Sequence, residues 1–301
     1  GEFWNTVLSM NQSEANYFAQ PTDLLGAQHL WDIDPYAQTS LGQLNNVLTP
    51  NSVVEEEDPF LYHYGISIKD LQLSSLWSKQ WEKVSFFIGG NLQQRSFRRE
   101  GFFQNGGFPE TSFGPGEAVE FNTWSAKTGF TIALSGRHRL SFNGGVFQVP
   151  PSIRSVYPNP RENHTIIPDP IPEDTHVIEG KYHWESSWFD LSLTTYWIEQ
   201  QNQNNVSFYF ADGVGGDEAF FVQEVLKGVN TLNQGVELGW KITLADVLDI
   251  KIAGAYGRHQ YANSPALLLL TEPSETAQKA GFLEGFKDFG SANLKGLFLP
   301  N

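Results

Sequence analysis

The stretch Lys83–Ser96, KVSFFIGGNLQQRS, alternates apolar and polar side chains in the pattern of a β-strand. Successive side chains of a strand point to opposite faces, so one face would carry Phe86, Ile88, Gly90 and Leu92. The opposite face would carry Ser85, Phe87, Gly89, Asn91, Gln93 and Arg95. A half-buried strand of a soluble sandwich and a strand of a membrane barrel both fit this pattern, so the rest of the chain has to decide between them.

The composition excludes several kinds of partner and site but does not decide between a soluble sandwich and a membrane barrel. The 301 residues are 14% aromatic and 18% charged, and they carry a formal charge of −15. Such an acidic chain argues against nucleic acid as a partner, because phosphate binding needs clustered Lys and Arg. The absence of Cys excludes a disulfide framework and a thiolate metal site. No signal-peptide pattern opens the chain, and its longest apolar run, Pro265–Leu270, is too short for a spanning helix.

Strand length and loop rhythm favour the membrane barrel. From Tyr62 onward, about eight alternating segments run for about ten residues or more, whereas strands of soluble proteins usually have five or six. Tight polar turns near residues 78–82, 135–138, 185–187 and 244–247 alternate with long irregular loops. Bacterial outer-membrane barrels have short turns on the periplasmic side and long loops outside. We therefore expect Phe86, Ile88 and Leu92 to face lipid and their polar neighbours to face the lumen.

The predicted fold is all-β, a transmembrane antiparallel β-barrel, with the whole chain forming one partial barrel domain. Residues 1–60 show no sustained period and are expected to form a long loop region of the extracellular type. Residues 61–262 are expected to form the barrel strands, in hairpins with short periplasmic turns and long outer loops. Residues 263–301 are expected to be loop, with a further strand starting near Leu294.

Two motifs carry a family resemblance. RREGFFQNGGFPE at 98–110 is a loop with NG and P before a strand, and GRHRLSFNGGVFQVPP at 136–151 closes the next hairpin. With the text around them, from Trp81 to Phe210, they resemble the barrel domain of TonB-dependent receptors of the Bacteroidota type. The resemblance implies part of a 22-stranded plugged barrel in the outer membrane. No plug-like or TonB-box-like segment is visible, so we expect an interior piece of a larger receptor or its ordered part.

The resemblance also implies a function and partners. Such a receptor is not an enzyme: it captures a small-molecule, glycan or peptide ligand through its extracellular loops and imports it with energy passed on by the TonB complex. Its other partners would be outer-membrane lipid and, in some cases, surface lipoproteins. Two alternatives stay open at this point. One is a soluble, aromatic-rich β-sandwich that binds polysaccharide, and the other is a structural outer-membrane scaffold for surface lipoproteins.

The long loops hold the candidate ligand-binding residues. Exposed aromatic clusters usually mark a binding surface, although the same residues can pack loops against each other. Guanidinium groups at the outer end of a strand can hold an anionic ligand or lipopolysaccharide phosphates, although pairing with Glu100 is the plainer interpretation. The candidates are Phe102, Phe103, Phe108, Phe113, Arg98, Arg99, Tyr157, Phe208 and Tyr209, and further loop aromatics are Phe210, Phe220 and Phe221.

No catalytic constellation is recognisable, and no cofactor is predicted. The seven His residues are scattered, without the spacing of a metal site. Acidic groups near Gly turns are weak calcium candidates, because hard cations take clustered carboxylate oxygens. These candidates are Asp212, Asp217 and Glu218, with the run Glu55–Asp58 as another. A hydrated acidic loop is the simpler interpretation of both segments.

Overall fold

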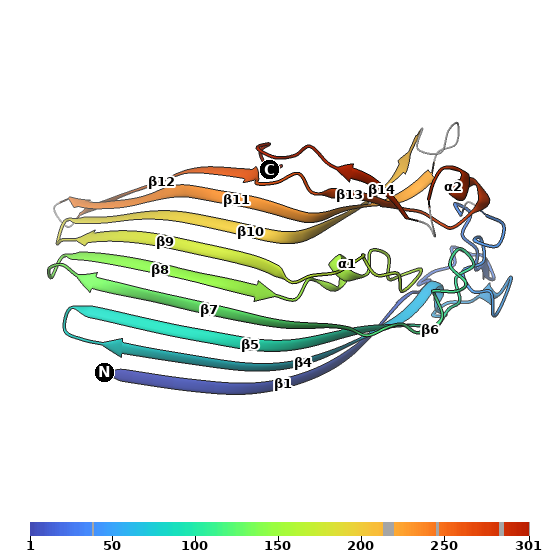
Figure 1. Cartoon of the computed structure of the whole chain (residues 1–301), viewed down its shortest axis with the longest axis horizontal. Coiled ribbons are helices and arrows are strands. Elements are labelled where there is room, and N and C mark those ends of the chain that lie inside the picture. The colour runs from blue at the N-terminus through green and yellow to red at the C-terminus, as the bar shows by residue number, and fades with distance from the viewer. Residues whose placement is uncertain (38, 213–219, 245–246, 283–285, 301) are drawn as a thin grey trace.

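The computed structural model describes residues 1–37, 39–212, 220–244, 247–282 and 286–300. Strands dominate these residues (Figure 1). The long strands are β1 (Glu2–Ala19), β4 (Phe60–Gln80), β5 (Val84–Gly101), β7 (Val119–Ala133), β8 (His138–Val149), β9 (Glu173–Glu185), β10 (Phe189–Ala211), β11 (Phe220–Leu244) and β12 (Leu248–Tyr261). The short elements are β2 (Leu30–Trp31), β3 (Val53–Val54), β6 (Gly114–Pro115), α1 (Ile153–Val156), β13 (Ala266–Leu270), α2 (Glu275–Lys279) and β14 (Phe286–Ser291). Neither described helix is long and apolar enough to cross a membrane.

Antiparallel pairing joins the long strands into one sheet in chain order. The 12-stranded sheet follows the order β1-β4-β5-β7-β8-β9-β10-β11-β13-β14, and β12 and β6 pair with β11 and β5. The tight turns all lie at one end of the sheet, and the long loops, both helices and the short strands lie at the other (Figure 1). The expectation of long antiparallel strands with alternating turn and loop lengths is confirmed. Closure of the sheet into a barrel, and a count of 22 strands, are not seen among the described residues.

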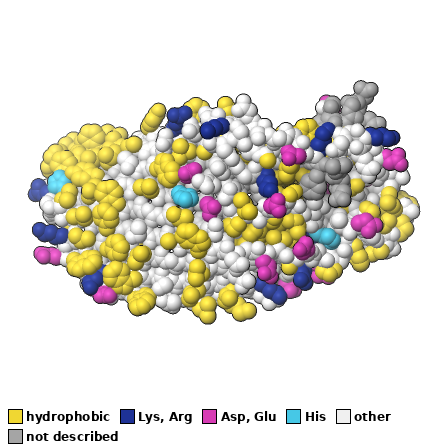
Figure 2. Space-filling view, in the orientation of Figure 1, with side chains coloured by type: hydrophobic (Ala, Val, Ile, Leu, Met, Phe, Trp, Pro, Cys, Tyr) yellow, Lys and Arg dark blue, Asp and Glu magenta, His cyan; other side chains and the backbone are white. Residues whose placement is uncertain are grey.

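The strand register assigns each side chain to one of two faces. Leu92 pairs with Leu73 of β4 and Trp124 of β7, and Leu73 pairs with Leu8 of β1. We call the face that carries them the apolar face. Its exposed large side chains include Trp4, Leu8, Met10, Leu71, Leu73, Ile88, Leu92, Trp124, Ile178, Val236, Leu238, Ile252 and Tyr256. Hydrophobic side chains also gather at the tight-turn end of the molecule in Figure 2.

Charged side chains of the strands lie on the opposite face, which we call the polar face. Arg95 and Asp70 pair there at 2.7 Å, Lys241 and Asp249 pair at 3.0 Å, and His183 contacts Asp190. Lys127, Glu179, Lys181, Glu237 and Lys251 share this face by register. The assignment of Lys127, Asp190, Glu237, Lys241, Asp249 and Lys251 to one face therefore agrees with the sequence pattern.

The first twenty residues differ from the expected loop. The region 1–60 begins with the 18-residue strand β1, which pairs with β4 from Glu2 to Ala19. Its alternation of Trp4, Leu8 and Met10 is interrupted by Thr6 on the same face and by Phe3 and Val7 on the other. This weak local signal is overridden by a continuous ladder of hydrogen bonds to the strand beside it, because strand propensity depends strongly on context.

The C-terminal region is also more structured than expected. The run ALLLL forms β13, which continues the edge occupied by β12 and pairs with residues 223–227 of β11. β14 adds to β13. Beyond it, Phe298 forms an antiparallel bridge with Gln260 of β12, four residues after the strand start expected near Leu294. β11 extends into the loop end of the sheet, so β13 can pair with it there, and β14 in turn pairs with β13.

Buried hydrophobic clusters lie at the loop end of the sheet. Phe97 and Phe121, on the polar face, pack with Val156 and Tyr157 of the 150–172 loop. Ile167 of that loop packs with Val225 and Leu270. A third cluster joins Ala211, Val222, Leu269, Ala277 and Phe282. The loops are thus folded structures with cores of their own, and they enclose the candidate site.

Candidate functional site

The proline-rich loop 150–172 folds back over the polar face and is fixed there by Arg99. The Arg99 guanidinium donates from Nε to the carbonyl of Pro160 at 2.6 Å and from NH1 to the carbonyl of Ser112 at 2.9 Å. The same NH1 lies 2.9 Å from Nδ1 of His164 and donates to it. Arg99 therefore ties together the 150–172 and 101–118 loops and the end of β5.

Burial around Arg99 keeps His164 neutral. Desolvation, and next the charge of Arg99, lower the pKa of His164 from 6.5 to about 4. A neutral imidazole offers its Nδ1 lone pair to the guanidinium, whereas an imidazolium would repel it. The contact therefore requires a deprotonated His164 at neutral pH.

Three adjoining cavities lie where the loops meet. The first, of about 410 Å³, shares Glu162 and Phe221 with a second of about 560 Å³. The first also shares Phe108, Gln223 and Glu272 with a third of about 850 Å³. Volumes of this size are typical of small-molecule sites. Most acidic side chains on the face drawn in Figure 2 lie over this loop-bearing half of the molecule.

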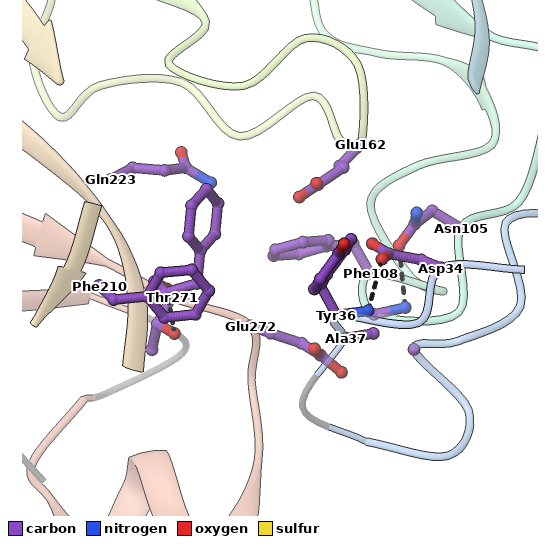
Figure 3. Close-up of a pocket in the computed structure, with 13 residues that line it drawn as sticks. Asp34, Tyr36, Ala37, Asn105, Phe108, Glu162, Phe210, Gln223, Thr271 and Glu272 are labelled. Carbon is purple, nitrogen blue, oxygen red and sulfur yellow. Dashed lines mark hydrogen bonds between the residues drawn. The ribbon is translucent and has the colours of Figure 1, made fainter. Parts of the chain in front are cut away.

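Side chains from separate segments line the first cavity, which we call the central cavity (Figure 3). The 20–59 loop contributes Asp34 and Tyr36, and the 101–118 loop contributes Asn105 and Phe108. Strands β10 and β11 contribute Phe210, Phe221 and Gln223, and Thr271 and Glu272 follow β13. Glu162 enters from the 150–172 loop with its carboxyl directed into the space.

Local hydrogen bonds hold these walls in place. The backbone N–H of Tyr36 donates to the Asp34 carboxylate at 2.9 Å, and that of Gly107 donates to the Asn105 side chain at 2.8 Å. The Thr271 hydroxyl donates to the carbonyl of Phe221 at 3.0 Å, and the Thr39 hydroxyl donates to the Glu272 carboxylate. The lining is therefore set by turns and loop contacts before any ligand enters.

Glu162 has the most perturbed carboxyl of the site. Burial is the first cause, and the charges of Asp34 and Glu272 are the next, so that the pKa of Glu162 rises from 4.5 to about 7. Arg161 and a hydrogen bond from Asn159 oppose this rise. The central cavity therefore has a negative potential that discourages a third ionised carboxylate.

Aromatic side chains give the cavities their apolar surface. Phe208 and Phe221 stack with ring centroids 6.2 Å apart, and Phe210 lies 5.2 Å from Phe221. Phe108 lines the central and third cavities, and Phe208 lines the second. Of the residues singled out from the sequence, the structure thus brings Phe108 and Phe208 to one site, together with Phe210 and Phe221.

Other residues from that set lie elsewhere. Arg99 and Tyr157 were among the expected ligand-binding residues, and here they are 1% and 0% exposed and serve as packing and hydrogen-bonding groups. Phe102 and Phe103 flank His63, and Phe113 is exposed. Arg98 is exposed on the side of the apolar face. Tyr209 donates its hydroxyl to Glu224 at 2.7 Å on the face of β10 that Phe208 does not occupy.

The calcium candidates gain no geometric support. Asp212 is exposed, and Asp217 and Glu218 lie outside the described residues. Among the residues that the structure describes, no group of three or more His, Asp or Glu side chains is placed to hold a metal ion. In the acidic run 55–58, the Asp58 carboxylate instead accepts the backbone N–H of Glu55 at 3.0 Å.

The sequence did not single out Asp34, Glu162, Gln223 or Glu272. They lie in four segments that are separated by tens of residues, without a shared motif. One signal was present, since Glu162 and Glu272 both fall in loops that contain Pro and little regular pattern. That signal marks a loop and gives no indication of which loops meet.

Comparisons with known proteins agree with the fold. No family model matches the chain, and no curated protein matches it. Among solved structures, it is similar to one titled "Copper transporter OprC", with a TM-score of 0.52 and 13% sequence identity. The match covers 76% of this chain and 37% of that one, so this chain spans little more than a third of the length of the structure it resembles. At such low identity the likeness concerns the fold alone.

Proposed function

We propose that this chain forms part of the β-barrel of an outer-membrane, TonB-dependent transporter, and that its long loops capture a ligand outside the cell for energised import. The protein is then a transporter and not an enzyme. The similarity in fold to a copper transporter supports the transport class. The copper specificity of that protein is not carried over, and the proposed type of TonB-dependent receptor rests on the resemblance of the sequence motifs at 98–110 and 136–151.

The observation that carries the proposal is a charge-free band on the apolar face. On β4, the charged residues Lys79 and Lys69 bound the apolar-face positions Trp77, Ser75, Leu73 and Leu71. Ten residues of strand extend about 33 Å. At a tilt of about 40°, they span about 25 Å, which is the height of the apolar band in outer-membrane barrels.

Neighbouring strands have the same boundary. On the loop side, Lys69 pairs with Gln12 and Ser96, which are followed on the same face by Glu14 and Arg98, and Ser96 pairs with Glu120. On β9, β10 and β12, the first charged apolar-face residues, Asp174, Glu199 and Arg258, lie at a similar distance from their tight turns. Below them, the described part of the apolar face carries no Asp, Glu, Lys or Arg until Glu2 and Lys79 are reached. A charge at mid-bilayer on this face would cost about 2–4 kcal/mol.

A soluble sandwich fits these facts less well. It would cover the apolar face with a second sheet, whereas the second sheet among the described residues is only the pair β2–β3. The side chains of Trp4, Leu8 and Met10 remain 70–83% exposed. Lipid is an occupant that suits a face of this area.

The edges of the described sheet also favour a larger barrel. β1 has a strand partner on one side only, and among the described residues the edge of β12 beyond β11 meets only residues 296–299, at its loop end. Unpaired backbone groups in lipid cost several kcal/mol each. We therefore propose that further strands pair with these edges in the membrane. Such strands would complete a barrel of the 22-stranded, plugged type, and the TonB complex would act on its plug.

The test is fractionation of the producing cells followed by detergent extraction. We expect the protein in the outer-membrane fraction, in a form whose gel mobility changes on boiling, as folded barrels show. Deletion of the gene for TonB should abolish ligand uptake while ligand binding to cells persists. A folded species in the aqueous fraction without detergent would refute the proposal, and uptake that continues without TonB would remove the energised part of it.

A further inference from the structure

The central cavity combines acidic and aromatic walls. Asp34, Glu162 and Glu272 contribute carboxyl groups, and Tyr36, Phe108, Phe210 and Phe221 contribute rings. None of the described residues that line it is Lys, Arg or His. Arg154 and Arg161 line the second cavity instead, where they lie over the rings of Phe208 and Tyr62 at 5.6 and 5.0 Å.

An independent observation points to a ligand. Gln223 is only 5% exposed, lines the central cavity, and has no side-chain hydrogen bond to another described residue. The amide meets the open space of the cavity, where a polar group of a ligand can supply the hydrogen bonds that the described side chains do not. The neighbouring cavity wall contains Phe221 and Phe210, the latter 61% exposed. A ligand with a polar group beside an apolar body would satisfy both.

The sign of the ligand charge follows from the walls. The carboxyls of Asp34 and Glu162 face the same space. Burial, and next the charges of its acidic neighbours, raise the pKa of Glu162 to about 7. A cation placed between them would relieve this repulsion, whereas an anion would add to it. Aromatic rings also attract cations to their faces.

We propose that the central cavity binds a ligand that presents a protonated amine or guanidinium group to Asp34 and Glu162 and an apolar body to Phe108, Phe210 and Phe221. Gln223 offers an acceptor and two donors beside the cationic group. This inference deepens the proposed function, since it names the class of ligand that the loops would capture. Its geometry also distinguishes the site from one for bare metal ions, for which the described residues show no cluster.

The test compares three probes that share a phenylethyl group: 2-phenylethylammonium, 2-phenylethanol and 3-phenylpropionate. Binding is measured by calorimetry on the full chain purified in detergent. Wild type, Glu162→Gln, Asp34→Asn and the control Glu120→Gln are titrated in the same micelles, so that partitioning of probes into detergent cancels. Glu120 is exposed and lies on the apolar-face side of β7, away from the loops that line the cavity.

We expect wild type and Glu120→Gln to bind the ammonium probe about tenfold more tightly than the alcohol, a difference of about 1.4 kcal/mol in binding free energy. Both should bind the carboxylate probe most weakly. Glu162→Gln and Asp34→Asn should each remove most of this preference. Equal affinity for the three probes, or an unchanged preference in both variants, would overturn the proposal. Binding of calcium alone that depends on Glu162 would overturn it as well.

The pH dependence gives a second readout. The titratable groups facing Glu162 are Asp34 and Tyr36 from the 20–59 loop, Glu272 after β13, and Arg161 beside it. The affinity for the ammonium probe should rise between pH 6 and 8 in wild type and stay flat in Glu162→Gln. If the protein fractionates with the outer membrane but shows no preference for the ammonium probe, only the proposed ligand class is refuted. If it prefers the ammonium probe but is found in the aqueous fraction, only the proposed transporter function is refuted.

Discussion

Arg99 donates a hydrogen bond of 2.6 Å to the backbone carbonyl of Pro160, across sixty-one positions of the chain. The donor stands at the end of β5, and the acceptor lies in the loop that covers the polar face. With the second bond to Ser112 and the contact with His164, one buried guanidinium determines where two loops sit. The cavities depend on that placement, because Glu162 follows Pro160 by two residues.

Replacing Arg99 by Lys should release the proline-rich loop. Lys keeps the charge but lacks the planar fork that reaches Pro160 and Ser112 together. Hydrogen bonds to charged groups contribute about 1.5–3 kcal/mol each, so we expect the local free energy of opening to fall by about 2–3 kcal/mol. Hydrogen exchange of the Ile167 amide, which bonds to the carbonyl of Val156 at 2.9 Å, measures this change.

Arg98→Lys is the matched control for this experiment, because Arg98 is the neighbouring residue and is exposed. It should leave exchange of the Ile167 amide unchanged. Equal protection in Arg99→Lys and wild type would show that packing of Val156 and Tyr157 alone holds the loop.

Glu162 and His164 should give the same loop opposite responses to pH. Between about pH 4.5 and 7, folded Glu162 holds more protons than the unfolded chain does, so its contribution to the free energy of unfolding falls as pH rises. Between about pH 4 and 6.5, the unfolded chain protonates His164 first, so that contribution rises with pH. The two effects offset each other in the wild-type chain.

Single substitutions should separate the two effects. In Glu162→Gln, protection of the 150–172 loop against hydrogen exchange should increase from pH 5 to 6.5, after correction for intrinsic exchange. In His164→Asn, whose side-chain oxygen can still accept from Arg99, protection should decrease over the same interval. Parallel profiles for both variants would contradict these assignments.

A charge in the apolar band should impair assembly, whereas the same charge on the polar face should not. Leu92 is 60% exposed on the apolar face, and its neighbour Gln93 donates to Asp70 at 2.8 Å on the polar face. Leu92→Lys should lower the free energy of unfolding in lipid by about 2–4 kcal/mol. Gln93→Lys places a cation beside Asp70 and should leave it nearly unchanged.

Urea titration of the protein folded into lipid vesicles, followed by tryptophan fluorescence, measures both variants. If the two substitutions cost the same, the apolar face does not contact lipid, and the membrane assignment loses its main support.

Gly106→Ala should separate the 20–59 loop from the 101–118 loop. A Cβ at Gly106 would lie 1.8 Å from the carbonyl oxygen of Leu41, so the backbone itself has to move. The Gly106 amide also donates to the carbonyl of Leu44 at 2.9 Å. We expect loss of charge-selective probe binding in the central cavity and faster proteolysis in the 20–59 loop.

Gly90→Ala is the control, since its added Cβ would meet the carbonyl of Ser125 at an ordinary 3.5 Å. It should retain binding and resistance to protease. Retention of probe binding in Gly106→Ala would show that the loop contact is not needed for the cavity.

The sheet could be predicted from the sequence because its information is local. In KVSFFIGGNLQQRS the polarity of the side chains alternates with the two-residue period of a strand, so a few residues are enough to assign each side chain to a face. Turn lengths gave the hairpin order in the same way. The strand β1 was missed because its alternation is interrupted and its long partner β4 stabilises it through backbone hydrogen bonds that carry no sequence signal.

The site was decided by tertiary structure alone. Sequence pattern marked Phe108 and Phe208 as loop aromatics, and likewise Arg99 and Tyr157, although the latter two are buried supports. Loop residues have no period, and the meeting of Asp34, Glu162, Gln223 and Glu272 depends on how four loops pack over the sheet. The sequence by itself determined a sided antiparallel sheet, because polarity alternates along each strand. Only the folded loops decided which acidic and aromatic side chains share one cavity, because that depends on contacts between segments far apart in the chain.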